Sequence, residues 1–392
     1  MNEALPFVEM LINALPFLIF MLFEMLMVGL AFKLSVAESV ESHESNAAKL
    51  QYKFNLASGT LLFLAYVVFV IFFTFVGIDA GSGGNDAIIY KERFEHANIP
   101  LLQSLRLQQN EWGYGLLIWL LRAITSDYRI VLFAVFSFSF FAMLYFIRHI
   151  KWTTYTVLSY SLILILLITG MCLIRNILSV SIGMIVYGLI YEKKYWKAII
   201  LATIGVSIHV TSIILYPIII MCVLLDNKKF SVGKLSLYLL LDATFLFLLM
   251  GVASTLVKGS KYAAYDATQG VAAATYLVFV LVLILSFARY KNLVEKNPFN
   301  RTLLIILATG LLCLVMQLQY SIAYRMLLFY IPITFALISE LMEEYKIFSF
   351  HKNGGFFVVY LGLFTYVVLI LYKFFSVGAV SYGLYPYIIR LN

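Results

Sequence analysis

The sequence predicts an all-α membrane protein with about 12 transmembrane crossings. Its 392 residues are 63% hydrophobic and only 12% charged, about half the charged share of an ordinary soluble domain. The apolar runs extend through the whole chain, which excludes a soluble enzyme, a disordered chain and a single anchor on a soluble body. They are continuous rather than alternating, so an outer-membrane barrel is not expected.

Nine runs are suited to crossing a hydrocarbon core of about 30 Å as helices. They are Leu5–Phe32, Leu56–Val76, Ile130–Ile147, Thr153–Leu173, Leu235–Leu256, Ala272–Ala288, Thr302–Leu318, Met326–Met342 and Phe356–Phe375. Three further runs are less regular. Gly113–Ile124 is short, and Asn176–Tyr191 is just long enough for a tilted span. Trp196–Leu225 is too long for one helix and is interrupted near His209 and Pro217.

The basic residues predict the orientation. We expect Gly113–Ile124 to be a short re-entrant helix, and Trp196–Leu225 to break near His209 into two short helices. Then 17 of the 28 basic residues collect on one face, which the positive-inside rule makes cytoplasmic, with both termini outside. They are Lys33, Lys49, Lys53, Arg148, Lys151, Lys193, Lys194, Lys197, Lys228, Lys229, Lys234, Arg289, Lys291, Lys296, Arg301, Lys346 and Lys352. If Gly113–Ile124 spanned fully, the later loops would invert.

This topology gives one membrane domain, residues 1–392, with two large outer loops at 77–112 and 257–271. Loops as long as the first are usually functional or disordered. Lys33–Asn55 mixes charge with Ser and Ala, and we expect a solvated or interfacial connector. The net charge of +8 is explained by the membrane-flanking loops, so it does not indicate nucleic-acid binding.

Two arginines are candidates for binding an anion. Arg175 lies in an apolar context, where a charged residue is costly and by default functional. The alternatives are snorkelling to the outer interface or a structural pair. Arg325 lies at the outer start of a predicted helix. Two guanidinium groups on one side would suit a diphosphate, because each makes bidentate bonds and keeps its proton.

One histidine falls within a predicted membrane segment. His209 is flanked by Ser207, Thr211 and Ser212 inside a long apolar run. One hypothesis is a polar residue that bridges two helices. The other is a general base, because imidazole titrates near neutral pH.

Acidic and aromatic residues share one predicted helical face in the first outer loop. Asp86, Tyr90 and Phe94 recur every four residues, and Glu111 precedes Trp112. Aromatic faces together with carboxylates suit sugar binding, although either carboxylate alone is equally consistent with a solvated loop charge. No cluster of His, Cys, Asp and Glu has metal-ligand spacing, so we expect neither metal nor cofactor.

The order of these motifs resembles that of the Wzy-type bacterial polysaccharide polymerases, in the EpsG-like branch. The matching motifs are Gly84-x-Asp86-x-x-x-Tyr90-x-x-x-Phe94, Glu111-x-Gly113-Tyr114, Arg175, His209-x-x-Ser212 and Arg325-x-x-x-x-Tyr330. The resemblance covers roughly residues 77 to 330. One departure is Asn176, which follows the first Arg where the family usually has Gln.

The resemblance implies a metal-independent glycosyltransferase of GT-C-like architecture in the bacterial cytoplasmic membrane. Such enzymes join oligosaccharide repeat units carried on undecaprenyl diphosphate into capsule, exopolysaccharide or O-antigen at the outer face. The implied partners are the lipid-linked oligosaccharide, membrane lipid and a chain-length regulator, with no nucleic acid. An O-antigen ligase would share the substrate, whereas a transporter of lipid-linked oligosaccharide should show polar residues accessible from both faces.

The resemblance also implies roles for particular residues. Arg175 and Arg325 would stabilise the leaving diphosphate, and His209 or Asp86 would orient or deprotonate the acceptor hydroxyl. The implied substrate contacts are Tyr90, Glu111, Trp112, Tyr114, Asn176, Ser212 and Tyr330.

Overall fold

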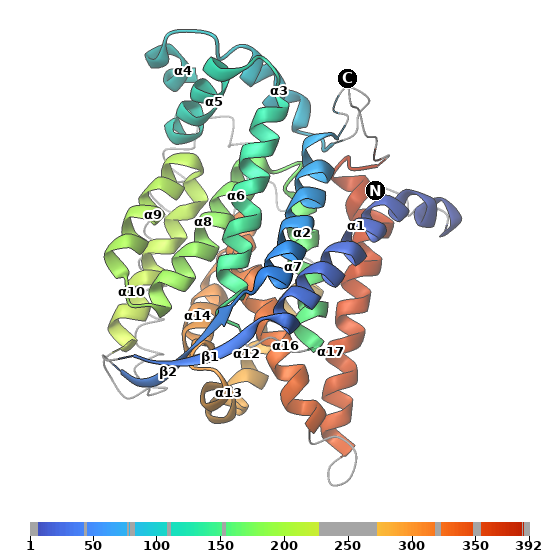
Figure 1. Cartoon of the computed structure of the whole chain (residues 1–392), viewed down its shortest axis with the longest axis vertical. Coiled ribbons are helices and arrows are strands. Elements are labelled where there is room, and N and C mark those ends of the chain that lie inside the picture. Colours follow the sequence, from blue (N-terminus) through green and yellow to red (C-terminus); the bar gives the residue numbers. More distant parts are fainter. Residues whose placement is uncertain are drawn as a thin grey trace.

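The computed structural model is a bundle of helices together with a two-stranded hairpin (Figure 1). It describes residues 7–42, 45–76, 78, 83–107, 111–150, 154–226, 273–317, 323–347, 354–385 and 387. Within these ranges six helices are long and apolar enough to cross a membrane, so the protein is a multi-pass membrane protein. The predicted span Leu235–Leu256 and loop 257–271 lie outside the described residues. The 12 crossings and the GT-C-like architecture stay predictions.

The longer helices coincide with the predicted apolar runs, and a helix of 19 residues extends about 28 Å. They are α1 (Phe7–Leu34), α2 (Leu56–Thr74), α6 (Arg129–Ile147), α7 (Thr154–Thr169), α8 (Ile174–Tyr191), α12 (Ala273–Ala288), α14 (Phe299–Gln317), α16 (Ile331–Ile347) and α17 (Gly354–Lys373). The shorter elements are α3 (Ala87–Glu95), α4 (Leu101–Leu107), α5 (Trp112–Ile124), α9 (Tyr195–Ile208), η1 (Val210–Ile214), α10 (Leu215–Asp226), α13 (Tyr290–Lys296), α15 (Ala323–Leu327), η3 (Leu328–Tyr330), the π-helix η4 (Phe374–Gly378) and α18 (Ala379–Ser381).

The connector between the first two helices differs from the prediction. The segment Lys33–Asn55 was expected to be a solvated or interfacial connector, and this stays a prediction; the all-α fold class did not include the hairpin of β1 (Val36–Ser42) and β2 (Ser45–Lys53) that it contains. The strands are antiparallel, with Val36 opposite Lys53. The sequence of β1 mixes apolar and polar residues without helical periodicity, which is compatible with a strand.

The chain breaks at His209, as predicted. Helix α9 ends at Ile208, His209 is extended with φ −151° and ψ 125°, and the chain continues as η1 and then α10. The second predicted interruption, at Pro217, is wrong, because α10 runs through it. Proline is tolerated in the first turn of a helix, where its missing N–H would have no intrahelical partner.

The first large outer loop is partly helical. Helices α3 and α4 lie at the same end of the bundle as α5 (Figure 1), and the Trp119 indole of α5 donates a hydrogen bond of 3.0 Å to the Ile99 carbonyl. Helix α5 has 13 residues and is about 20 Å long, so it is short, as expected. Its re-entry into the membrane stays a prediction.

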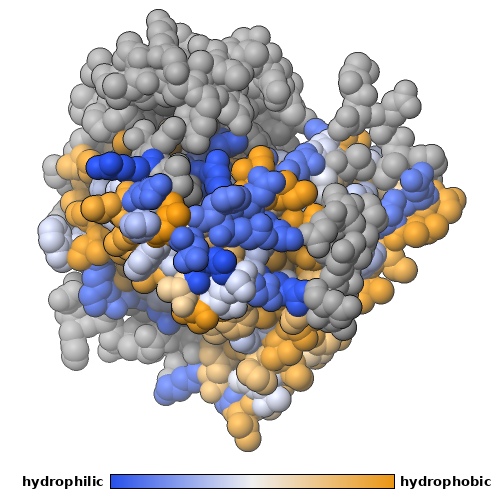
Figure 2. Space-filling view, turned by 90° about the horizontal axis from the view of Figure 1, so that it is seen from above, coloured by the Kyte–Doolittle hydropathy of each residue, from blue (hydrophilic) through white to orange (hydrophobic). Residues whose placement is uncertain are grey.

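Helix α8 is largely enclosed by the bundle and packs against α6, α9 and α14. Small residues let these neighbours approach: the Ser181 hydroxyl lies 2.8 Å from that of Ser139 in α6. Helix α8 also contacts η3, and a methyl group on Gly183 would lie 2.9 Å from the Phe329 ring of η3. This packing fixes the first turn of α8, which carries Arg175, at the end near α3 and α5. Seen from that end, hydrophilic residues gather between hydrophobic ones (Figure 2).

Candidate active site

A buried carboxylate joins the arginine and the histidine that the sequence places in apolar surroundings. Glu111, the residue before α5, accepts hydrogen bonds from Nη1 of Arg175 and from Nδ1 of His209 through its two carboxylate oxygens. Glu111 is 3% exposed and His209 is 2% exposed. The predicted outer carboxylate is therefore not a solvated loop charge. It neutralises Arg175 and fixes the imidazole.

The three residues meet because two helix ends approach unusually closely. A methyl group on Gly113, in the first turn of α5, would overlap with the Ser207 hydroxyl of α9 and lie 2.9 Å from the Ser207 carbonyl carbon. Glycine at position 113 therefore allows α5 to begin directly against the end of α9. The chain break then turns His209 toward the residue that precedes α5.

Two tyrosine rings enclose the Arg175 guanidinium. Its central carbon lies 5.4 Å from the Tyr90 ring centre and 5.9 Å from that of Tyr114. Arg175 Nε also donates to the Tyr90 hydroxyl at 3.5 Å. Cation–π contacts of this kind are stronger when the groups are desolvated. Tyr90 of α3 and Tyr114 of α5 thus hold the guanidinium in one orientation.

Several buried polar atoms around this cluster have no hydrogen-bond partner among the described residues. They are the Tyr114 hydroxyl, Nδ2 of Asn176 and the Ser212 hydroxyl. Asn176 follows Arg175 in α8, and its Oδ1 accepts a 3.4 Å hydrogen bond from Thr211 of η1. Buried polar groups are nearly always satisfied by protein, water or ligand. These atoms can therefore donate hydrogen bonds to a polar ligand or to water.

Asp86 and Arg325 lie near the turn that leads into α8. Gly84, with φ +107°, packs so closely that a methyl group there would be 2.7 Å from the Cys172 Cα. Cys172 is within electrostatic range of both Asp86 and Arg325, and Arg325 is also within range of His209. The two arginines predicted to act together therefore lie at the same end of the bundle.

A segment near the C-terminus packs on the Gly84–Asp86 corner. The Gly84 and Asn85 amides donate to the Gly383 and Tyr382 carbonyls at 3.1 and 2.9 Å. The Asn85 side chain donates to the Ser381 carbonyl at 2.8 Å. These bonds fix the backbone directly before Asp86, so this segment positions that carboxylate.

Two predicted substrate contacts, Tyr330 and Trp112, differ in their exposure to solvent. Tyr330 is fully buried in the bundle, and its hydroxyl lies 3.1 Å from that of Thr309 in α14. Trp112, the first residue of α5, is 52% exposed. The structure therefore gives Tyr330 a packing contact between helices and leaves the Trp112 ring on the surface.

The family of the chain follows from comparing its sequence with known protein families. A sequence model of the EpsG family matches residues 62–389. The chain belongs to the EpsG family. Neither curated proteins nor solved structures gave a match. Membership indicates a polysaccharide polymerase-like membrane protein, and the matched region includes Glu111, Arg175, His209 and Arg325.

This EpsG-family site contains features that the sequence analysis missed. Tyr128 is 4% exposed, its hydroxyl has no partner among the described residues, and its ring centre lies 5.8 Å from that of Phe94. No motif marked Tyr128, since tyrosine is common throughout the chain. Gly113 belonged to a recognised motif, but only the structure shows what its missing side chain allows. No group of three or more His, Cys, Asp or Glu suited to a metal occurs in the described ranges.

Proposed function

We propose that this protein is a glycosyltransferase that polymerises oligosaccharide repeat units carried on undecaprenyl diphosphate. Family membership supports a polymerase-like activity. The observation that carries the finer proposal is the buried Arg175–Glu111–His209 cluster at one end of a membrane bundle. We place that end at the outer face of the bacterial cytoplasmic membrane, because the tight basic loops lie at the other end. The product would be capsule, exopolysaccharide or O-antigen.

The proposed reaction is a substitution at the anomeric carbon of the growing chain. A hydroxyl oxygen of the incoming unit forms a bond to that carbon. The bond from the carbon to the diphosphate oxygen breaks, and its electron pair leaves with undecaprenyl diphosphate. Arg175 and Arg325 are suited to stabilise the charge that develops on the leaving group, because preorganised donors in a water-poor site stabilise such charge strongly.

Glu111 supports a role for His209 in accepting the proton of the hydroxyl. An ionised carboxylate can only accept hydrogen bonds, so His209 donates its Nδ1–H to Glu111. The lone pair is then on Nε2, which can take the acceptor proton while Glu111 stabilises the imidazolium that forms. Asp86 is the alternative base, and the bonds of Gly84 and Asn85 to the Ser381–Gly383 segment position its backbone.

The aromatic residues divide into two roles. Tyr90 and Tyr114 already contact the Arg175 guanidinium, so we assign them to positioning it. Trp112 keeps an exposed ring beside Glu111 and is the better candidate for stacking on a sugar. Asn176, Ser212 and the Tyr114 hydroxyl would donate to sugar or phosphate oxygens, which would satisfy their hydrogen-bonding capacity.

The test is polymerisation by purified protein supplied with lipid-linked repeat units. Glu111→Gln should reduce the initial rate of ladder formation by about 10²–10⁴. Glu95→Gln is the matched control, because Glu95 is an exposed carboxylate on α3 at the same end of the bundle, and it should polymerise normally. If both variants polymerise equally, the cluster is structural and the proposal fails.

Removing the Glu111 charge leaves Arg175 buried without its counterion, which destabilises the fold. A second variant keeps the proposal testable if Glu111→Gln does not fold. Arg175→Lys keeps the ion pair with Glu111 but loses the planar guanidinium group that can make bidentate bonds. It should lower the polymerisation rate by a factor of about 10²–10³. The same assay separates the alternatives. A ligase would transfer one chain to a lipid A core acceptor without forming ladders, and a transporter would move the substrate without joining units.

A further inference from the structure

A groove lies between α2 and α6 at the end of the bundle opposite the Glu111 cluster. It has a volume of about 260 Å³. Its lining residues are Phe54, Leu62, Phe141, Leu144, Tyr145 and Arg148. Five of these present apolar or aromatic surface and one is a cation, so the groove suits an amphiphile better than a fully polar ligand.

The groove is closed toward the middle of the bundle. The Tyr66 hydroxyl of α2 lies 3.0 Å from that of Ser137 in α6, and the Tyr66 ring lies 5.1 Å from the Phe141 ring. From Phe141 to Arg148, seven residues of helical chain span about 10 Å. The apolar part is therefore a short slot with one inner end and one charged mouth.

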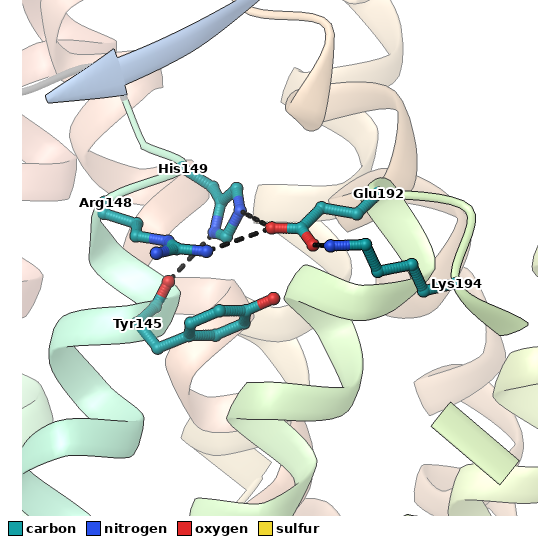
Figure 3. A network of polar contacts seen from close by, with 5 residues as sticks. All are labelled: Tyr145, Arg148, His149, Glu192 and Lys194. Carbon is teal, nitrogen blue, oxygen red and sulfur yellow. Dashed lines mark hydrogen bonds and ion pairs between the residues drawn. The ribbon is translucent and has the colours of Figure 1, made fainter. Parts of the chain in front are cut away.

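The cation at this mouth is held in place. The Arg148 guanidinium lies 4.1 Å from the Tyr145 ring centre and donates to Glu192 at 3.0 Å. Glu192 also contacts His149 at 3.2 Å and Lys194 at 2.6 Å (Figure 3). Only one Arg148 nitrogen takes part in the bond to Glu192, whereas a guanidinium carries five N–H donors.

This network keeps a positive charge at the mouth of the groove. Burial alone would raise the pKa of Glu192, but hydrogen bonds from His149 and Lys194 hold that pKa well below its ordinary value. Among the described side chains, the ionised carboxylate is the one acidic partner of both Arg148 and Lys194, so it balances one of these two cations and not the other. Trp196, 73% exposed, lies beside this network in the sequence and is typical of a membrane–water interface.

We propose that the groove binds an anionic membrane phospholipid, with one acyl chain between α2 and α6 and the phosphate on Arg148. The apolar slot matches a hydrocarbon chain, and the net positive mouth matches an anionic head group. A polyprenyl phosphate shares this chemistry, but we assign the groove to phospholipid, because the proposed reaction site lies at the other end of the bundle. The binding does not depend on polymerase activity.

The test is lipid titration into delipidated full-length protein, followed by mass spectrometry of the intact complex. Phosphatidylglycerol should bind more tightly than phosphatidylcholine, and Arg148→Gln should weaken phosphatidylglycerol binding about fivefold. Leu144→Trp fills the slot while keeping the cation, and it should lower the affinity for both lipids. The matched control is Lys291→Gln, which removes an 86% exposed cation on α13 and should change nothing. Thermal unfolding checks that each variant is folded.

Three results would overturn the assignment. Equal binding of the two phospholipids to the wild type would show that the head group is not recognised. If Arg148→Gln and Lys291→Gln lower the affinity for phosphatidylglycerol equally, the lipid is attracted by the overall positive charge and not by a specific site. Preferential binding of undecaprenyl phosphate, lost in Leu144→Trp, would assign the groove to the lipid carrier instead.

Discussion

Replacing Gly113 by Ala should separate α5 from α9 and pull Glu111 away from His209. The added methyl group would overlap with the Ser207 hydroxyl and lie 2.9 Å from the Ser207 carbonyl carbon. Carbon atoms make favourable contact at about 3.5–4.0 Å, so the backbones must separate by at least about 0.6 Å. Misplacement on this scale can cost about 10²-fold in rate, and overpacking costs about 1–3 kcal/mol in stability.

The assay is the initial rate of polymer ladder formation by purified variants, with thermal unfolding in parallel. Gly59→Ala is the matched control, because it is also helical and its new methyl group meets nothing within 4 Å. Adding Ser207→Gly to the Gly113→Ala variant removes the hydroxyl and Cβ that obstruct the methyl group. It should restore part of the rate, since the carbonyl carbon remains. Equal rates for Gly113→Ala and Gly59→Ala would refute the requirement for close approach.

Three further predictions concern the base, the topology and the network around Glu192. His209→Gln should cost about 10²–10⁴ in ladder rate at an unchanged protein level, and normal ladders would remove His209 as the base. An impermeant thiol reagent on intact cells should label Glu95→Cys, at the predicted outer end, and not Lys291→Cys, at the predicted cytoplasmic end. The native cysteines are buried and should give little background. The reverse labelling pattern would show that the topology is inverted. Glu192→Gln should lower the thermal stability at neutral pH. The folded-state pKa of Glu192 is lowered, so the wild type should exceed the variant in stability by a constant amount above the unfolded-state pKa of about 4.3. This stability difference should shrink as the pH falls below that value. A stability difference that does not change with pH would contradict the prediction.

The helices were predictable because each is encoded by a continuous local run. A 19-residue apolar segment indicates a membrane helix without reference to any other part of the chain. The break at His209 was predictable for a similar reason, since a polar cluster interrupts an otherwise apolar run. The hairpin at residues 36–53 was missed, because its pairing depends on two segments whose composition indicates only a polar connector.

The connections within the candidate site were less predictable. Glu111 is separated from Arg175 by 64 residues and from His209 by 98, and periodicity cannot show that three such positions meet. The stripe of Asp86, Tyr90 and Phe94 was predicted as one helical face. Within it, Tyr90 contacts Arg175, whereas Phe94 is buried against Tyr128 and Arg122. Spacing therefore gave the face of the helix but not the partner of each side chain.

The packing of the Ser381–Gly383 segment on the Gly84–Asp86 corner has a consequence for biosynthesis. The two partners in the Asn85–Ser381 bond are 296 residues apart, so the ribosome makes one long before the other. While the intervening helices are being translated and inserted, the corner that carries Asp86 lacks the backbone that fixes it. The polar end of the bundle is therefore completed only at a late stage of synthesis, after the last helices have been translated.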